Sequence, residues 1–184
     1  FLMTHQIGFI GHRGHAKKLL DIVEEEENFE VSKIYHPTKN LDDSRGTNNL
    51  KDLHDCDIAI EAVYENLDLK MDIFKSLDEH VKPGAILASN TSGLDIDAIA
   101  SVTSRPELVV GTHFFSPANI MRLLEVVRGE QTSNETLATI MSVGKKIKKT
   151  AVVSLNAPGF IGNRMLFGYT AQANMLLLEG ALPH

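Results

Sequence analysis

This sequence has a single cysteine, no long apolar run and no excess of basic residues, and each of these features argues against a class of protein. Cys56 is the single cysteine among 184 residues, which excludes an internal disulfide framework and suits a reducing, cytoplasmic setting. No apolar run reaches the roughly 18 residues of a membrane span. Asp and Glu (24) outnumber Lys and Arg (18), which argues against a nucleic-acid surface. We therefore expect neither a membrane nor a nucleic acid as a partner.

The order of apolar runs predicts an α/β protein. Hydrophobic residues make up 43% and charged residues 23% of the chain, as in ordinary globular domains. Nearly continuous apolar runs predict strands of a parallel sheet that is covered on both faces. These runs lie at residues 6–10, 29–35, 57–63, 85–90 and 108–114, with further strands expected at 123–129 and 150–155. Helical patterns at 13–27, 66–81 and 95–102 alternate with them, which predicts a doubly wound, mainly parallel sheet of the Rossmann type.

Two further helices are expected toward the end of the chain. Thr132 and Glu135 have the spacing of a capping box, which predicts a helix that runs to about residue 147. The last segment, from about 161 to 180, is apolar on nearly every side. A helix of that kind needs cover on more than one side. We expect residues 1–160 to form a dinucleotide-binding domain and residues 161–184 to form a C-terminal helix.

The first strand is followed by a glycine-containing turn with the sequence "IGFIGHRGHA". In the pattern G-x-G-x-x-G, the second glycine lets the backbone approach a pyrophosphate. The frame here has Gly11 at the first position and Arg13 at the second, followed by Gly14. His36 ends the second strand, where an acidic residue usually binds the ribose of NAD, and Lys39 is near enough to meet a 2′-phosphate. Two alternatives stay open: a turn without a nucleotide, or a weak dinucleotide site with no strong preference for NAD over NADP.

The segment "HFFSPANIMRLLE" has a titratable residue at each end of an apolar stretch. Burying either group alone costs several kcal/mol unless it finds a partner. A strand that ends near His113, a turn at Ser116 and Pro117, and a returning strand near Glu125 can bring the two ends together. We predict a hydrogen bond between His113 and Glu125, and we expect the apolar residues between them to exclude water.

Four blocks in the rest of the chain carry a family resemblance. "EAVYENLDLK", "AILASNTSGLDIDAIAS", "HFFSPANIMRLLEVVRG" and "NAPGFIGNRML" all resemble the 3-hydroxyacyl-CoA dehydrogenase family, and together they span about residues 57–180. The resemblance implies a Rossmann-type NAD domain that oxidises a 3-hydroxyacyl thioester to the 3-ketoacyl form. The substrate it implies is an acyl-CoA. It also implies that the C-terminal helix at residues 161–184 is the start of a missing helical dimerisation domain.

Functional residues follow from the resemblance position by position. It implies that His113 is the catalytic base and that Glu125 is its carboxylate partner. It also implies that Ser92 contacts substrate and cofactor, and that Asn163 is the active-site asparagine. Positions near the nicotinamide half of the cofactor are Glu65, Lys70 and Asn90. Histidine suits proton removal because its ordinary pKa lies near neutral pH. No metal is implied.

The resemblance weakens toward the amino end. Residues 1–56 look more like the start of an oxidoreductase of the Gfo/Idh/MocA kind, and the loop at 36–56 is shorter than the helical insertion that the family uses to hold CoA. One interpretation is therefore a recombined or engineered chimera without turnover. The other is a dehydrogenase domain that forms a homo-oligomer through its apolar C-terminal helix.

Overall fold

A single mixed sheet organises the chain. The computed structural model describes residues 5–11, 15–24, 29–35, 46–47 and 49–182. Within these residues the sheet has eight strands in the order β3-β2-β1-β4-β5-β6-β7-β8. The strands are β1 (His5–Gly11), β2 (Phe29–Tyr35), β3 (Gly46–Thr47), β4 (Ile58–Ala62), β5 (Ile86–Ser89), β6 (Val109–Phe114), β7 (Leu123–Arg128) and β8 (Thr150–Leu155). Strands β1 to β6 are parallel, whereas β7 is antiparallel to β6 and parallel to β8.

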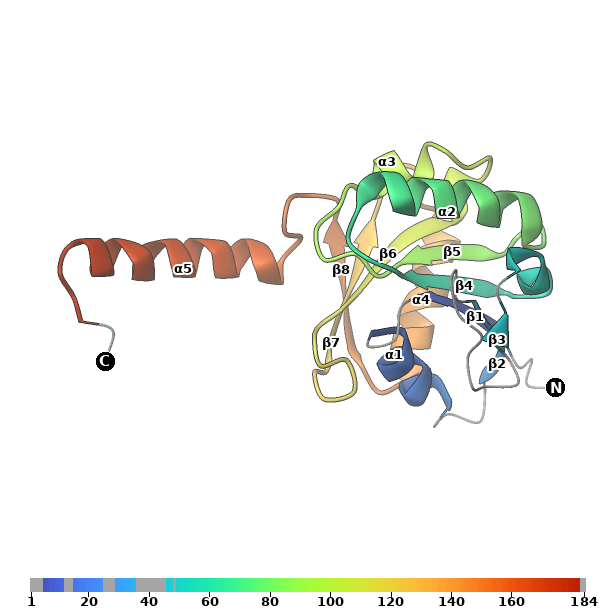
Figure 1. Ribbon diagram of the computed structural model, residues 1–184, viewed down its shortest axis with the longest axis horizontal. Coiled ribbons are helices and arrows are strands. Elements are labelled where there is room, and N and C mark those ends of the chain that lie inside the picture. Colours follow the sequence, from blue (N-terminus) through green and yellow to red (C-terminus); the bar gives the residue numbers. More distant parts are fainter. Residues whose placement is uncertain (1–4, 12–14, 25–28, 36–45, 48, 183–184) are drawn as a thin grey trace.

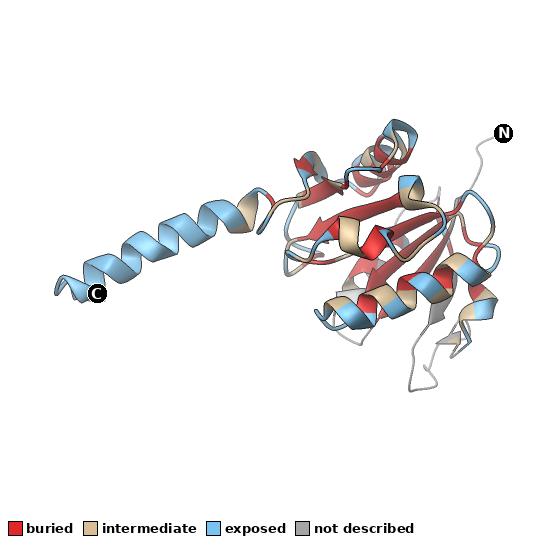
Figure 2. Ribbon diagram, turned by 90° about the horizontal axis from the view of Figure 1, so that it is seen from above, coloured by how far each residue is buried: buried red, intermediate tan, exposed pale blue. Residues whose placement is uncertain are grey.

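Helices cover both faces of this sheet. They are α1 (His15–Glu24), α2 (Leu67–His80), α3 (Ile96–Ala100), α4 (Asn134–Lys146) and α5 (Gly162–Leu178), with 3-10 turns η1 (Leu50–Leu53) and η2 (Pro106–Leu108). Helices α1 and α4 lie on one face and α2 and α3 on the other (Figure 1). Each face has its own apolar core: Leu19 and Ile140 pack against one side, and Phe74 and Ile99 against the other. Strands β4, β5 and β6 are therefore buried on both faces, as their continuous apolar runs predicted, whereas β8 at the edge of the sheet is partly exposed (Figure 2).

The strand order creates a switch point between β1 and β4. From β1 the chain winds outward to β2 and β3, and it then returns to the other side of β1 through β4. Gly11, at the end of β1, is the register partner of Ala62 at the end of β4. Open α/β sheets bind ligands in the crevice at the carboxyl ends of the strands, where the strand order reverses. The expected doubly wound, Rossmann-type fold is thus confirmed.

Most of the predicted elements are present with small differences at their ends. Strands 29–35 and 150–155 match their predicted limits, and the others differ by one or two residues. The predicted capping box is wrong by one position. Ser133, not Thr132, caps α4 by accepting a hydrogen bond from the Thr136 N–H. The Thr132 hydroxyl instead donates to the Val109 carbonyl and accepts from the Gly129 N–H, so it fastens the end of β7 to β6.

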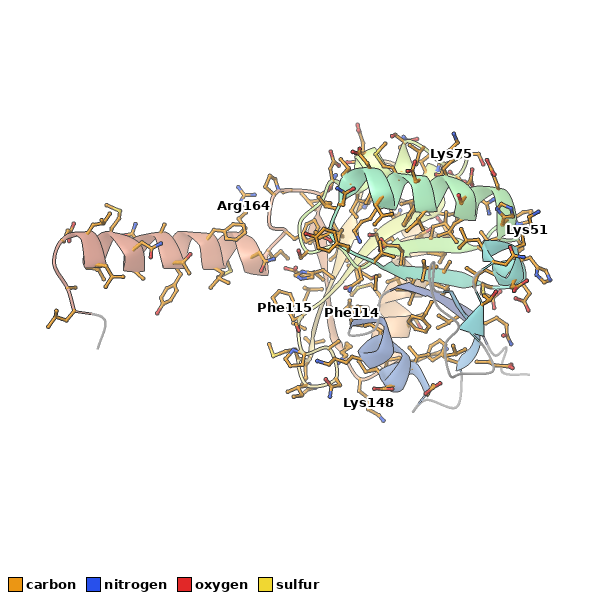
Figure 3. All side chains as sticks on the ribbon, viewed as in Figure 1. Lys51, Lys75, Phe114, Phe115, Lys148 and Arg164 are labelled. Carbon is orange, nitrogen blue, oxygen red and sulfur yellow. The ribbon has the colours of Figure 1, made fainter. Side chains whose placement is uncertain are left out.

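Helix α5 extends away from the sheet as a separate rod (Figure 1). None of its residues is buried, although many of them are apolar. Met165, Phe167 and Leu178 are 72%, 59% and 88% exposed. Its side chains stand out around the helix on all sides (Figure 3). Among the described residues, no helix is long and apolar enough to cross a membrane.

Candidate active site

Two neighbouring antiparallel strands hold the histidine and the glutamate. His113 on β6 lies directly opposite Glu125 on β7 in the sheet register. The His113 Nδ1 and the Glu125 Oε2 are 2.7 Å apart, and both side chains are buried. The predicted contact is therefore confirmed, and the turn at Ser116 and Pro117 produces it by reversing the chain. Because Nδ1 is engaged, Nε2 is the ring nitrogen that His113 can offer to a substrate.

The second oxygen of Glu125 meets the start of α5. Oε1 accepts hydrogen bonds from the backbone N–H groups of Ile161, at 3.0 Å, and Gly162, at 2.7 Å. A helix N-terminus has unpaired N–H groups and a partial positive charge, so it stabilises an ionised carboxylate. A Cβ on Gly162 would lie 2.6 Å from the Phe115 ring, so glycine permits this close approach. Glu125 is thus fixed on both sides.

Aromatic rings shield the histidine. The centroid of the Phe115 ring lies 4.4 Å from the His113 ring, and that of Phe160 lies 5.9 Å away. The rest of the apolar segment behaves differently, because Ile120 is 69% exposed and Met121 is 40% exposed. The expectation that the whole segment excludes water is therefore wrong. The two phenylalanines beside the histidine provide the cover, and the tip of the β6–β7 loop faces solvent.

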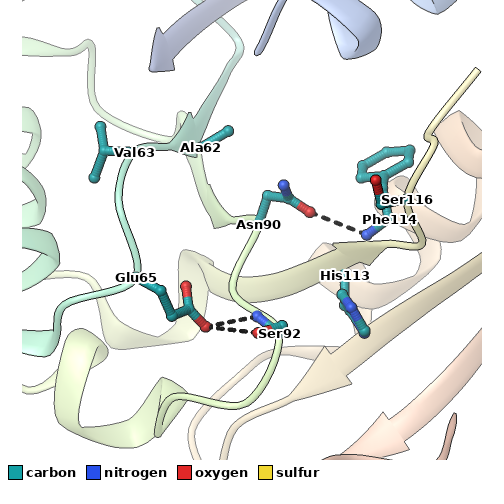
Figure 4. A pocket seen from close by; sticks show the side chains of 8 residues that line it. All are labelled: Ala62, Val63, Glu65, Asn90, Ser92, His113, Phe114 and Ser116. Carbon is teal, nitrogen blue, oxygen red and sulfur yellow. Dashed lines mark hydrogen bonds between the residues drawn. The ribbon is translucent and has the colours of Figure 1, made fainter. Parts of the chain in front are cut away.

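A cavity of about 320 Å³ opens at the carboxyl ends of β4, β5 and β6. Its lining residues come from three successive loops and strand ends: Ala62, Val63, Glu65, Asn90, Ser92, His113, Phe114 and Ser116 (Figure 4). Four of the eight were predicted as site residues, namely Glu65, Asn90, Ser92 and His113. The sheet brings them together although 48 positions separate the first from the last in the sequence (65 to 113).

Glu65 organises the loop that carries Ser92. Its Oε1 accepts from the Thr91 hydroxyl at 2.6 Å, the Ser92 N–H at 2.8 Å and the Ser92 hydroxyl at 3.0 Å. Burial alone would raise the pKa of Glu65, but these hydrogen bonds and the charge of Lys70 together hold that pKa below its ordinary value. The Ser92 hydroxyl donates to Glu65 and so retains only its acceptor capacity toward the cavity.

Lys70 lies behind the cavity wall. It is completely buried, and its Nζ donates to Glu61 Oε1 at 2.8 Å and Oε2 at 2.9 Å. Its Nζ is also 3.6 Å from Glu65 Oε2. Glu61 and Ser89, which donates to Glu61 at 2.8 Å, were missed by the sequence reasoning. A glutamate inside the apolar run "DIAIEAV" was a usable signal, because a lone charge in a buried strand needs a partner.

The two asparagines brace the same region. Asn90 Oδ1 accepts from the Phe114 N–H at 3.0 Å, which leaves its NH₂ group for the cavity (Figure 4). Asn163, in the first turn of α5, donates from Nδ2 to the Ser92 carbonyl at 3.0 Å. Asn163 therefore joins α5 to the loop of Ser92, and it adjoins the cavity through that loop.

The expected cofactor turn is described only in part. Gly11 is buried at the end of β1, beside Ala62 of the cavity wall. The predicted residues Arg13, Gly14 and His36, together with Lys39, lie outside the described residues. The roles assigned to them stay predictions.

The switch-point crevice and the buried acid–base pair define the class, which is a dinucleotide-binding oxidoreductase domain. A family model described as "3-hydroxyacyl-CoA dehydrogenase, NAD binding domain" matches residues 12–157. The chain therefore belongs to this family, and its cofactor is NAD.

Named relatives agree with this family. The chain is 48% identical over 168 residues to the peroxisomal bifunctional enzyme of Homo sapiens, a match that covers 91% of this chain and 23% of that protein. It is 42% identical over 134 residues to a probable 3-hydroxybutyryl-CoA dehydrogenase of Deinococcus radiodurans, covering 73% of this chain and 48% of the relative. The chain thus spans just under a quarter of the bifunctional enzyme and about half of the bacterial protein.

Solved structures show the same fold. The (S)-3-hydroxybutyryl-CoA dehydrogenase of Ralstonia eutropha has a TM-score of 0.83 at 29% identity, covering 98% of this chain and 74% of that one. The family match begins at residue 12. The interpretation of residues 1–56 as the start of an unrelated oxidoreductase, and of the chain as a chimera, is therefore unsupported.

Proposed function

We propose that this chain is the NAD-binding and catalytic part of an enzyme that oxidises 3-hydroxyacyl-CoA thioesters to 3-ketoacyl-CoA. One observation carries the proposal: His113, paired with a buried carboxylate, faces the cavity at the carboxyl ends of the strands. Relatives that are named as 3-hydroxybutyryl-CoA dehydrogenases support the substrate class.

The residues of the cavity fit a nicotinamide group. The cavity lies beside the switch point, and its volume of about 320 Å³ suits one end of a dinucleotide rather than the whole molecule. Ala62 and Gly11 are small, so the backbone of β1 and β4 can be approached closely. The Asn90 NH₂ group and the Ser92 hydroxyl oxygen provide a donor and an acceptor for a carboxamide. When bound, the nicotinamide ring supplies the hydride acceptor.

His113 removes the proton in this mechanism. Its Nε2 accepts the proton of the substrate 3-hydroxyl group while the C3 hydride leaves, so that a carbonyl forms at C3. The Glu125 carboxylate holds the proton on Nδ1, which keeps Nε2 free as the acceptor, and it stabilises the imidazolium that results. Phe115 and Phe160 limit water around the ring, which strengthens this electrostatic interaction.

Binding and turnover can be tested on the chain as it is. Titration with NADH and with NADPH measures cofactor binding, and reduction of acetoacetyl-CoA by the better binder measures turnover in the reverse direction. We expect His113→Gln to remove most of the rate while dinucleotide binding persists. The matched control is His54→Gln, because His54 is exposed near η1 at the opposite end of the sheet. Equal rates for His113→Gln and the parent chain would contradict the assignment.

We also propose that the chain self-associates through α5. Burial of apolar surface is worth roughly 25 cal/mol per Å², so a few hundred Å² of bare surface represents several kcal/mol of drive toward association. Arg164 is the only charged residue within α5, and Tyr169 and Met175 are 75% and 51% exposed. A second copy of the same helix offers a matching apolar surface.

Sedimentation at tens of micromolar tests this proposal. We expect the parent chain to be larger than a monomer, and Leu176→Lys with Leu177→Lys to reduce its size. The control replaces Val153 and Leu155 on β8, which are 46% and 72% exposed, by Lys. A monomeric parent chain, or an α5 variant that behaves like this control, would refute association through α5.

A further inference from the structure

The cavity wall is backed by a completely buried ion pair. Glu61 ends β4 and Lys70 lies in the first turns of α2, and neither side chain is exposed to solvent. Glu61 also accepts from the Val63 N–H at 2.5 Å and from the Ser89 hydroxyl at 2.8 Å. Both carboxylate oxygens and the ammonium group therefore have defined partners.

Burial of this ion pair contributes little to the free energy of unfolding. Removing two charges from water costs several kcal/mol for each, and well-packed apolar residues often do as well or better. Lys70 is also near the N-terminus of α2, where the helix dipole disfavours a positive charge. A contribution to stability therefore does not explain the lysine at position 70, whereas a contribution to the adjacent cavity does.

The pair connects to the cavity through Glu65. The Lys70 Nζ lies between Glu61 and Glu65, 2.8 Å from one carboxylate and 3.6 Å from the other. Glu65 lines the cavity with a side chain that is 38% exposed, and its Oε1 is fully used by Thr91 and Ser92. Two carboxylates and one ammonium leave this cluster with one net negative charge, which reaches the cavity at Glu65.

We propose that Glu61 is a positioning residue that, through Lys70, sets the charge at Glu65 so that the cavity binds the oxidised nicotinamide ring more tightly than the reduced ring. This inference rests on the proposed function. The oxidised ring carries one positive charge and the reduced ring carries none, so a net negative wall attracts only the oxidised form. After the 3-hydroxyl group is oxidised, the ring is neutral and the attraction is lost, which favours release of the reduced dinucleotide.

The ratio of two dissociation constants tests the proposal without an activity measurement. Calorimetry gives the Kd for NAD⁺ and for NADH with the parent chain, Glu65→Gln and Glu61→Gln. Each substitution removes one negative charge without changing size. We expect the preference for NAD⁺ over NADH to fall by roughly five- to tenfold in both variants. The matched control is Asp72→Asn, the same charge change on the exposed side of α2, which should keep the parent ratio.

The outcomes separate the two proposals. If both affinities change by the same factor in Glu65→Gln, the side chain has only a structural role and the proposal is overturned. If Glu61→Gln does not fold, as judged by circular dichroism, the Glu65→Gln result decides, because Glu65 is on the rim of the cavity. If the parent chain binds neither dinucleotide, the proposed function fails and this inference fails with it.

Discussion

Replacing Glu125 with glutamine should move the proton of the neutral His113 ring from Nδ1 to Nε2. The Glu125 Oε1 accepts two backbone N–H groups from the start of α5, and the other oxygen faces the histidine Nδ1. A glutamine has one oxygen and one NH₂ group. The two α5 donors require the oxygen, because an NH₂ group there would face N–H groups at 2.7 Å and 3.0 Å. The NH₂ group must then point at His113.

This orientation has a chemical consequence. An NH₂ group opposite Nδ1 makes that nitrogen an acceptor and moves the ring proton to Nε2. With its proton on Nε2, the histidine cannot accept the substrate proton. In serine proteases the corresponding Asp-to-Asn change costs about 10⁴ in rate because of the wrong tautomer. We expect a loss of roughly 10³ to 10⁴, which corresponds to about 4 to 5.5 kcal/mol of activation free energy.

Two measurements check the reasoning. Acetoacetyl-CoA reduction gives the rate, and ¹⁵N NMR of the histidine ring reports directly which nitrogen carries the proton. The variant should fold normally, because size and packing are kept. Retention of more than about a tenth of the parent rate, or a ring that still carries its proton on Nδ1, would refute the orientation assigned to the glutamine.

Three further predictions concern stability. Thr112→Val should stabilise the fold by about 1 kcal/mol in denaturant unfolding, because the Thr112 hydroxyl is buried among the described residues without a hydrogen-bond partner; a loss of stability would indicate a hidden partner. Hydrogen bonds from Ser104 and Arg105 outweigh the effect of burial and hold the pKa of Asp78 below its ordinary 3.8. Its contribution is therefore present above that value and lost as the pH falls through the folded pKa, so Asp78→Asn should flatten the loss of stability between about pH 5 and pH 2. Gly159→Ala should destabilise the fold by about 1 to 3 kcal/mol in denaturant unfolding, because φ at Gly159 is +73° and a Cβ there would meet the Arg164 backbone. Gly168→Ala is the control on open helix surface and should be neutral or stabilising. Equal changes in stability for the two variants would contradict this account.

Strand positions were predictable because burial on both faces leaves a plain mark on the sequence. The run at residues 57–63 is apolar at most positions, and the strand β4 that it predicted is buried throughout. Residues 29–35 and 150–155 mix apolar with polar positions, and the observed strands still have the predicted limits. The helix boundaries were less certain. Thr132 and Ser133 are both good caps, and a long-range bond from Thr132 to the Val109 carbonyl decides between them. The sequence does not show that bond.

The site was predictable where local chain geometry produces it. The chain reverses between β6 and β7 and so places His113 opposite Glu125, and the spacing of the two residues together with the family resemblance predicted this contact. The cluster behind the cavity was not. Lys70 and Glu61 are nine positions apart, but they come from a helix and a strand whose relative placement depends on the whole sheet. Ser89 completes the cluster from the neighbouring strand, at a register that the chain alone does not specify.

The two ends of α5 differ in their surroundings, because its start contacts the Glu125 carboxylate and the rest faces solvent. Its residues from Arg164 onward are exposed, yet the N–H groups of Ile161 and Gly162 at its start hold one oxygen of Glu125. Asn163, one residue later, holds the loop of Ser92. The first turn of α5 therefore belongs to the site, whereas the remaining turns present apolar side chains to solvent.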